Sequence, residues 1–347
     1  MAPASTRRSR APPAPPPPAS PSLAPTAHSP SFRAALTSAF LALVLVSVVG
    51  LFSLLPATPS LDSPAHQAAL QASLQASPSS SSTMALQKQR AVAAIVGGFV
   101  ADAATMGLHW IYDPEKLSAL IAAAPAPEFH EPPACPFYSY ESGALSPYGA
   151  EVTPLLEFVA AKGSFEPSGY GDASYHAAKS YTGRLNGVFR ELVKKGDAGE
   201  KYPNLATENN DLHGGIKTPV LVAKYLGDTA ALVAKTKEAT QVHQIGVEAT
   251  DAAVACALLL QQIVEGTPIP AAVAALTTSD HIGAPTRSLV QAVVDAVANK
   301  TRAMLIGAIA AAAAVQDVAS ADPVPAEWKA KATDFDHIQK LAQQLVQ

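Results

Sequence analysis

Acidic and imidazole side chains that lie close together in the chain are the first candidates for chemistry. His109 and Asp113 are four residues apart, so on a helix both would point to one face and could hold a metal or act as an acid–base couple. Asp113 also directly precedes Pro114, a position from which an aspartate caps the helix that follows. We favour this capping role. Asp102 lies in an otherwise apolar stretch, and we interpret it as a buried acid that bonds to a neighbouring loop rather than as a catalytic group.

Further acids and histidines are candidates only if the fold brings them together. Glu141 and Glu151 flank a Ser-Pro-Tyr-Gly sequence and could form the carboxyl pair of a glycosidase, which requires a separation of about 5–10 Å. The sequence does not define that distance. His213, His243 and His281 fall in separate segments without the spacing of metal ligands. We therefore expect these three histidines to be packed or solvated side chains, and we assign no metal ligand.

Composition and motifs weigh against several functional classes. The 347 residues carry a formal net charge of -4 and a sequence pI near 6.1, which gives no basic footprint for nucleic acid. We expect no nucleic-acid partner. Two cysteines, Cys135 and Cys256, are too few for a disulfide framework or a four-thiolate zinc site. The sequence contains no P-loop, no GxGxxG after a strand and no GxSxG elbow, so nucleotide hydrolysis, dinucleotide-dependent redox and serine-hydrolase chemistry have no support.

The chain opens with a leader of three parts. Residues 1–33 form a basic, proline-rich arm, residues 34–55 form an apolar stretch without formal charge, and residues 56–83 form a Ser/Pro/Gln linker. About 20 apolar residues can cross a bilayer as a helix, so we expect a membrane partner through residues 34–55. Basic residues before the stretch favour a single-pass anchor with the following domain lumenal. A cleaved signal and a plastid transit peptide are the alternatives that the composition leaves open.

Residues 84–347 have the periodicity of helices that must position these candidates. Val92, Ile95, Val96 and Phe99 follow the spacing of one apolar helix face, and similar faces recur along the chain between clusters of Gly, Pro, Asn and Asp. No convincing alternating strand is present. Aromatic residues make up only 6% of the chain, which favours close-packed helices over a β-sandwich. We predict one large all-α domain, with two small helical bundles as the alternative.

Four motifs in this domain carry a resemblance to a known family. Residues 97–113 read GGFVADAATMGLHWIYD, residues 146–149 read SPYG with Glu151 after them, residues 302–309 read RAMLIGAI and residues 325–328 read PAEW. In this order they resemble the opening helix, the second motif, the last core helix and the closing segment of the ADP-ribosylglycohydrolase family. The HWIYD ending is most similar to the branch that contains the J1 crystallins. The resemblance implies a single orthogonal helical bundle.

The same resemblance implies a chemistry that the sequence only partly supports. Family members bind ADP-ribose at a dinuclear magnesium site and hydrolyse its glycosidic bond, with metal ligands from a Thr-Asp-Asp run and an Asp-x-Asp-Thr run. Here residues 148–151 read YGAE and residues 298–301 read ANKT, so Lys300 stands where the second run has an aspartate. His109 replaces a further acid. Because hard cations need several oxygen ligands, we expect the family's magnesium site to be degenerate.

Two functions remain open at this point. The first is an ADP-ribosylglycohydrolase-like protein with a degenerate metal site, which keeps a pocket for an ADP-ribose-like ligand. The second is a non-catalytic scaffold of the J1-crystallin type, a fold kept after its chemistry is lost. For either function the catalytic residues stay unassigned, and the expected pocket lies between the opening helix and the two motif helices. Its candidate residues are Asp102, His109, Asp113, Ser146, Tyr148, Glu151, Asn299 and Thr301.

Overall fold

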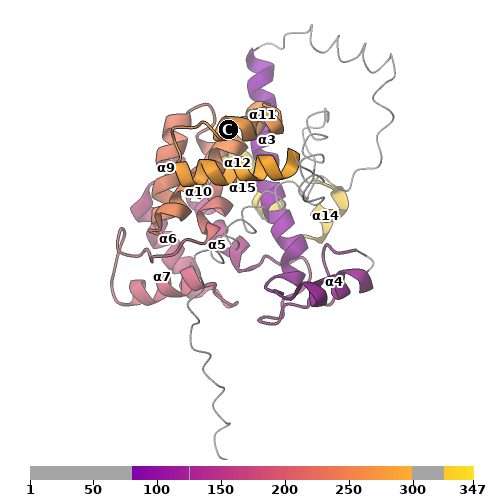
Figure 1. Cartoon of the computed structure of the whole chain (residues 1–347). Coiled ribbons are helices and arrows are strands. Elements are labelled where there is room, and N and C mark those ends of the chain that lie inside the picture. The colour runs from indigo at the N-terminus through magenta and orange to yellow at the C-terminus, as the bar shows by residue number, and fades with distance from the viewer. Residues whose placement is uncertain (1–79, 125, 299–323) are drawn as a thin grey trace, which may run out of the picture.

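The computed structural model describes residues 80–124, 126–298 and 324–347 (Figure 1). The predicted arm 1–33 and the predicted membrane segment 34–55 lie outside the described residues, as does the linker up to residue 79. The last residues of that linker belong to the first described helix, which begins at Ser80. Two of the predicted site residues, Asn299 and Thr301, also lie outside the described part.

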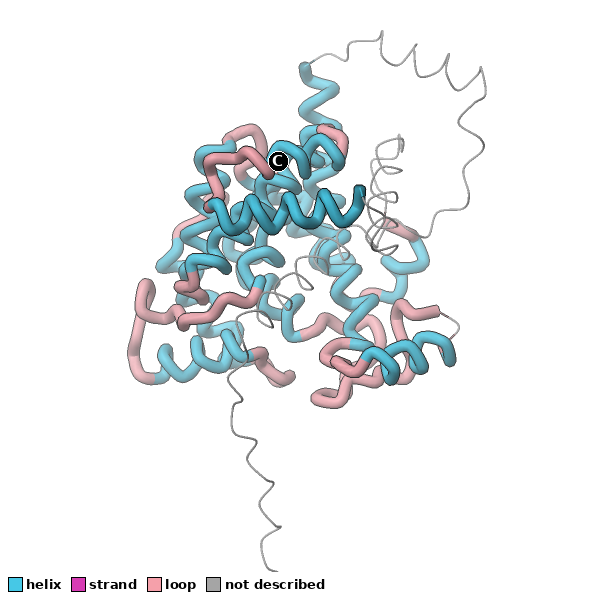
Figure 2. Tube along the Cα trace, viewed as in Figure 1, coloured by secondary structure: helices cyan, strands magenta, loops and turns pink. Residues whose placement is uncertain are grey.

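The described residues form helices joined by loops, which confirms the predicted all-α fold (Figure 2). In these residues, extended pairing is limited to one isolated bridge, between Thr207 and Gln244. The described elements are α3 (Ser80–Thr105), η1 (Met106–Leu108), α4 (Pro114–Ala123), α5 (Pro147–Lys162), α6 (Pro167–Ser180), α7 (Gly187–Asp197), η2 (Leu212–Lys217), α8 (Thr218–Lys224), α9 (Thr229–Gln241), α10 (Val247–Glu265), α11 (Ile269–Leu276), α12 (Ala284–Ala298), α14 (Ala326–Lys331) and α15 (Phe335–Leu345).

Several helices begin where a side-chain cap meets a proline. Asp113 accepts hydrogen bonds from the backbone N–H groups of Glu115 and Lys116 and so caps α4. This confirms the capping role favoured from the sequence. Ser146 caps α5 in the same way, with its Oγ accepting from the N–H of Tyr148 at 3.0 Å. The proline that follows each cap has a backbone preset for the first helical turn and lacks an N–H that would need a partner.

The core of the domain is built around α3. The predicted apolar face is buried, with Ile95, Val96 and Phe99 each less than 7% exposed. These side chains join one cluster with buried residues of α5, α8, α10 and α15, and α15 crosses α3 in Figure 1. This packing places the C-terminal end of α3 beside the N-terminal end of α5, where the candidate site residues meet.

Two of the described helices are long and apolar enough to cross a membrane by length and composition, Thr83–Leu108 and Val247–Glu265. In each helix, more than half of the most apolar 18-residue stretch is buried inside the domain. Because the core helix of a soluble protein meets the same criterion, this is weak evidence for a membrane span. Both helices serve here as packing elements of the core.

Candidate functional site

Asp102 joins the end of α3 to the start of α5. Its carboxylate accepts a hydrogen bond from the backbone N–H of Ser146 at 2.8 Å and one from the Ser146 hydroxyl at 2.5 Å. Burial raises the pKa of Asp102, while His109 and the hydrogen bonds from Ser146 act in the opposite direction. Gly149 permits this contact, because a Cβ at position 149 would collide with the Asp102 carboxylate. Asp102 is thus bonded to the loop before α5, as the sequence predicted, and it is partly rather than fully buried.

Tyr148 lies at the centre of a group of aromatic and imidazole rings. Its hydroxyl accepts a hydrogen bond from the indole N–H of Trp110 at 3.0 Å, and its ring lies 6.1 Å from the ring of His109 and 5.4 Å from that of His213. Burial, the largest influence, raises the pKa of Tyr148 to about 12, so the hydroxyl is protonated at neutral pH. The fold therefore brings the predicted residues His109 and Tyr148 together.

His109 carries a polar atom that the protein leaves without a partner. Its Nε2 lies 3.0 Å from the Thr105 hydroxyl, whereas its buried Nδ1 has no hydrogen-bond partner. Burial lowers the pKa of His109, and the charge of Asp102 only partly opposes this effect. A neutral imidazole with one open nitrogen can accept or donate a hydrogen bond, depending on its tautomer.

Glu151 is the centre of a buried ionic cluster. Its Oε1 lies 2.7 Å from Nζ of Lys217, and its Oε2 lies 2.7 Å from both Nδ1 of His213 and Nδ2 of Asn186. The side chains of Glu151 and Lys217 have no exposed surface. Burial acts to raise the pKa of Glu151, but the charges of Lys217 and His213 outweigh it and hold the pKa well below its ordinary value. The carboxylate is therefore ionised and fully engaged by protein donors.

His243 completes the cluster on the other side of Glu151. Its Nδ1 lies 3.6 Å from Oε1 of Glu151, which is beyond hydrogen-bond distance, and its ring packs against those of Tyr170 and Phe189. Burial first, and then the charge of Lys217, lower the pKa of His243 to about 4. His243 is consequently neutral at physiological pH.

The family model for the ADP-ribosylglycohydrolases matches residues 83–298, which is more than half of the chain. The chain belongs to this family. Crystallin J1B and crystallin J1A of Tripedalia cystophora are 41% and 40% identical to it over 88 residues. Each match covers 25% of this chain and 27% of the crystallin, so the chain spans only about a quarter of the length of these relatives.

A solved structure described as an ADP-ribosylglycohydrolase-related protein complex is also similar to this member of the family. The match covers 75% of this chain and 98% of that chain, with 18% sequence identity and a TM-score of 0.49.

The magnesium pair that the family resemblance implies does not fit the residues described here. Asp102 uses both carboxylate oxygens to accept from Ser146, and Glu151 uses both of its own for Lys217, His213 and Asn186. Within residues 80–298 and 324–347, apart from residue 125, no group of three or more His, Cys, Asp or Glu side chains is placed to hold a metal. A hard cation needs several oxygen ligands, and the Lys217 ammonium beside Glu151 would repel a cation at that carboxylate.

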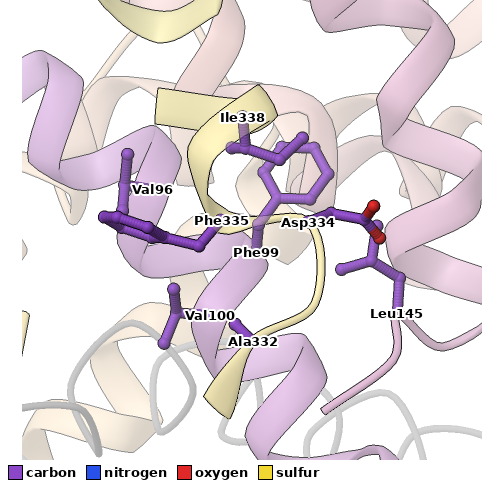
Figure 3. Close-up of a pocket in the computed structure, with 8 residues that line it drawn as sticks. All are labelled: Val96, Phe99, Val100, Leu145, Ala332, Asp334, Phe335 and Ile338. Atoms are coloured by element: carbon purple, nitrogen blue, oxygen red, sulfur yellow. The ribbon is translucent and has the colours of Figure 1, made fainter. Parts of the chain in front are cut away.

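Other candidates from the sequence do not join the site. Asp113 is occupied as the cap of α4, His281 is exposed in a turn, and Glu141 is exposed. Because the ionised carboxylate of Glu151 forms a buried ion pair with Lys217, it is not available as the partner of Glu141 in a glycosidase pair. The apolar pocket in Figure 3 is also separate: Val96, Phe99 and Val100 of α3 face Phe335 and Ile338 of α15 there.

Sequence reasoning missed most partners of Glu151. We expected His213 and His243 to be isolated, packed or solvated side chains. Both are packed, but they are not isolated, because both lie against the carboxylate of Glu151. We did not consider Lys217 or Asn186. One local signal was present, because His213 and Lys217 are four residues apart and side chains at that spacing share a helix face. The contact of that face with Glu151 depends on tertiary packing.

Proposed function

We propose that this protein is a non-catalytic, magnesium-independent member of the ADP-ribosylglycohydrolase family that uses the helical domain as a structural or ligand-binding scaffold. One observation carries the proposal: the fully buried carboxylate of Glu151 is paired with the Lys217 ammonium at 2.7 Å, while the partly buried Asp102 is bound to Ser146. Metal-assisted glycoside hydrolysis needs a cation to polarise water and substrate. A cation at Glu151 would have to displace the Lys217 ammonium or lie beside it, and both cost free energy in a buried site.

The similarity to the J1 crystallins is consistent with a scaffold role. These are the relatives at about 40% identity, over a quarter of their length. A family fold can persist after its site has changed, because packing and chemistry depend on different residues. In this chain the altered site residues form internal bonds that stabilise the fold.

A ligand-binding scaffold is favoured over a purely structural one by the ring group around Tyr148. The rings of His109, Trp110 and Tyr148 are partly exposed and lie together, and they would suit a glycosyl or ADP-ribose-like ligand. Such a ligand combines hydroxyl groups, which bond to an imidazole, with planar groups, which stack on aromatic rings.

The test is calorimetric titration of the full-length protein with ADP-ribose, with magnesium or with EDTA, together with an assay for release of ADP-ribose from an ADP-ribosylated substrate. We expect no hydrolysis and no effect of magnesium on binding. A heat of ADP-ribose binding that does not change with magnesium would identify a ligand-binding scaffold. No measurable heat of binding would identify a structural one. Magnesium-dependent binding or turnover would overturn the proposal.

A matched pair of tyrosine variants locates any binding. Tyr148→Ala removes the ring between Trp110 and His213 and should abolish the heat. Tyr112→Ala removes a tyrosine that is 77% exposed and should leave it unchanged. Equal binding by both variants would show that the ligand binds elsewhere.

We also propose that residues 34–55 anchor the protein in a membrane, with the domain on the lumenal side. The support is the uncharged apolar run and the basic residues that precede it. Plastid targeting is the alternative explanation of the same composition.

A further inference from the structure

Lys217 occupies an unusual position for a lysine. Its side chain has no exposed surface, and its Nζ donates to Oε1 of Glu151 at 2.7 Å and to the backbone carbonyl of His213 at 3.0 Å. Lysine is among the residues that are almost never fully buried unless paired. A buried ammonium is tolerated only when nearby acceptors replace the water it has lost. The buried charge of Lys217 therefore depends on its pairing with Glu151.

The Glu151 carboxylate also depends on this ammonium. Its other described partners at hydrogen-bond distance are the amide of Asn186, which is uncharged, and the imidazole of His213. The amide of Asn186 orients the carboxylate but cannot balance its charge, and an imidazole such as that of His213 carries a positive charge only when it is protonated. An ionised carboxylate without exposed surface requires a permanent positive charge nearby, and Lys217 is the lysine that contacts it.

We propose that the Lys217 ammonium is the built-in counter-cation of Glu151, so that the centre of the folded domain needs no divalent ion. This inference rests on the proposed magnesium-independent function and deepens it by naming the residue responsible. Lys217 lies at the end of η2 and Glu151 in the second turn of α5. The ion pair thus links two segments that are 66 residues apart in the chain. It holds them together without a metal ion.

The proposal predicts that the two charges compensate each other. In Lys217→Met, an apolar chain of similar length replaces the lysine and leaves the Glu151 charge buried without its counter-ion. In Glu151→Gln/Lys217→Met, both charges are removed together, and the glutamine keeps an oxygen that can accept from Asn186 or His213. Removing one partner of a buried pair is far more damaging than removing both.

The experiment is thermal unfolding of the full-length protein and these variants, each with EDTA and with magnesium chloride. We expect wild-type protein to unfold at the same midpoint in both conditions. Lys217→Met should unfold about 10 °C lower, and the double variant should recover at least half of that loss. Lys224→Met, at a partly exposed lysine near the end of α8, is the matched control and should shift the midpoint little.

Two results would overturn the inference. A wild-type midpoint that rises with magnesium would show that a cation still binds the folded domain. A double variant that is no more stable than Lys217→Met, or that does not fold, would show that the two charges do not compensate each other. If Lys217→Met alone fails to fold while the double variant folds, compensation is supported. These outcomes are separate from the ADP-ribose test, because compensation can hold in a protein that hydrolyses its ligand at other residues.

Discussion

Ser146 donates both its backbone N–H and its hydroxyl to the carboxylate of Asp102, 44 residues earlier in the chain. The same Ser146 hydroxyl accepts from the N–H of Tyr148 and so caps α5. One serine therefore begins a helix and fastens it to the core helix α3. The acid at position 102 therefore positions α5 against α3.

The raised pKa of Asp102 predicts a specific pH dependence of stability. Between the unfolded value near 3.8 and the higher folded pKa, the folded state binds the proton more readily than the unfolded chain. The stabilisation by protonated Asp102 is therefore complete below pH 3.8 and is lost as pH rises through the folded pKa. The free energy of unfolding of wild-type protein, relative to Asp102→Asn, should fall as pH rises from 3.5 to 7.

Urea unfolding of both proteins across this range measures that difference. A difference between wild type and Asp102→Asn that is constant with pH would contradict the prediction.

The lowered pKa of His243, about 4, predicts the opposite trend. In the unfolded chain His243 takes up a proton as pH falls below its ordinary pKa of 6.5. In the folded protein it takes up the proton only near pH 4. Stability is present above pH 6.5 and is lost as pH falls through this window, by up to about 3 kcal/mol. His243→Phe, which keeps a ring against Tyr170 and Phe189, should lose less stability between pH 6.5 and pH 4.5. Denaturant titrations at these two pH values test this, with exposed His281→Gln as the control.

Asn186 combines two roles that mutagenesis can separate. Its Oδ1 accepts from the N–H of Phe189 and caps α7, while its Nδ2 donates to Glu151. Asn186→Ala should lower the free energy of unfolding by about 2–4 kcal/mol, because it removes a cap and a buried donor. Asn186→Ser keeps an oxygen for the cap and should cost less. Urea unfolding compares the two, and equal losses would mean that the cap contributes nothing.

The proposed anchor gives a prediction that is independent of the site. Full-length protein expressed in cells should remain with the membrane pellet after alkaline carbonate extraction, and a variant that lacks residues 34–55 should be released. Release of the full-length protein would contradict the anchor. Import of the full-length protein into isolated plastids would support the alternative.

Local features of this protein were predictable from its sequence. The apolar face of α3 has a helical period, and burial of Ile95, Val96 and Phe99 follows directly from it. The cap at Asp113 was predictable because a capping side chain bonds to backbone groups only two or three residues away. The motifs at 97–113 and 146–149 predicted the family, since the family model matches residues 83–298, which contain both; the motifs at 302–309 and 325–328 lie beyond this match.

The cluster around Glu151 was decided only by tertiary structure. Asn186, His213 and Lys217 are 35, 62 and 66 residues from Glu151 in the chain, and none of them stands in a motif with it. Periodicity records which face of each helix is buried, because burial acts on every residue of that face. It does not record which polar groups meet across a helix interface. That depends on how α5, η2 and the start of α7 pack. In this packing Glu151, a pocket candidate in the sequence, is balanced by a lysine.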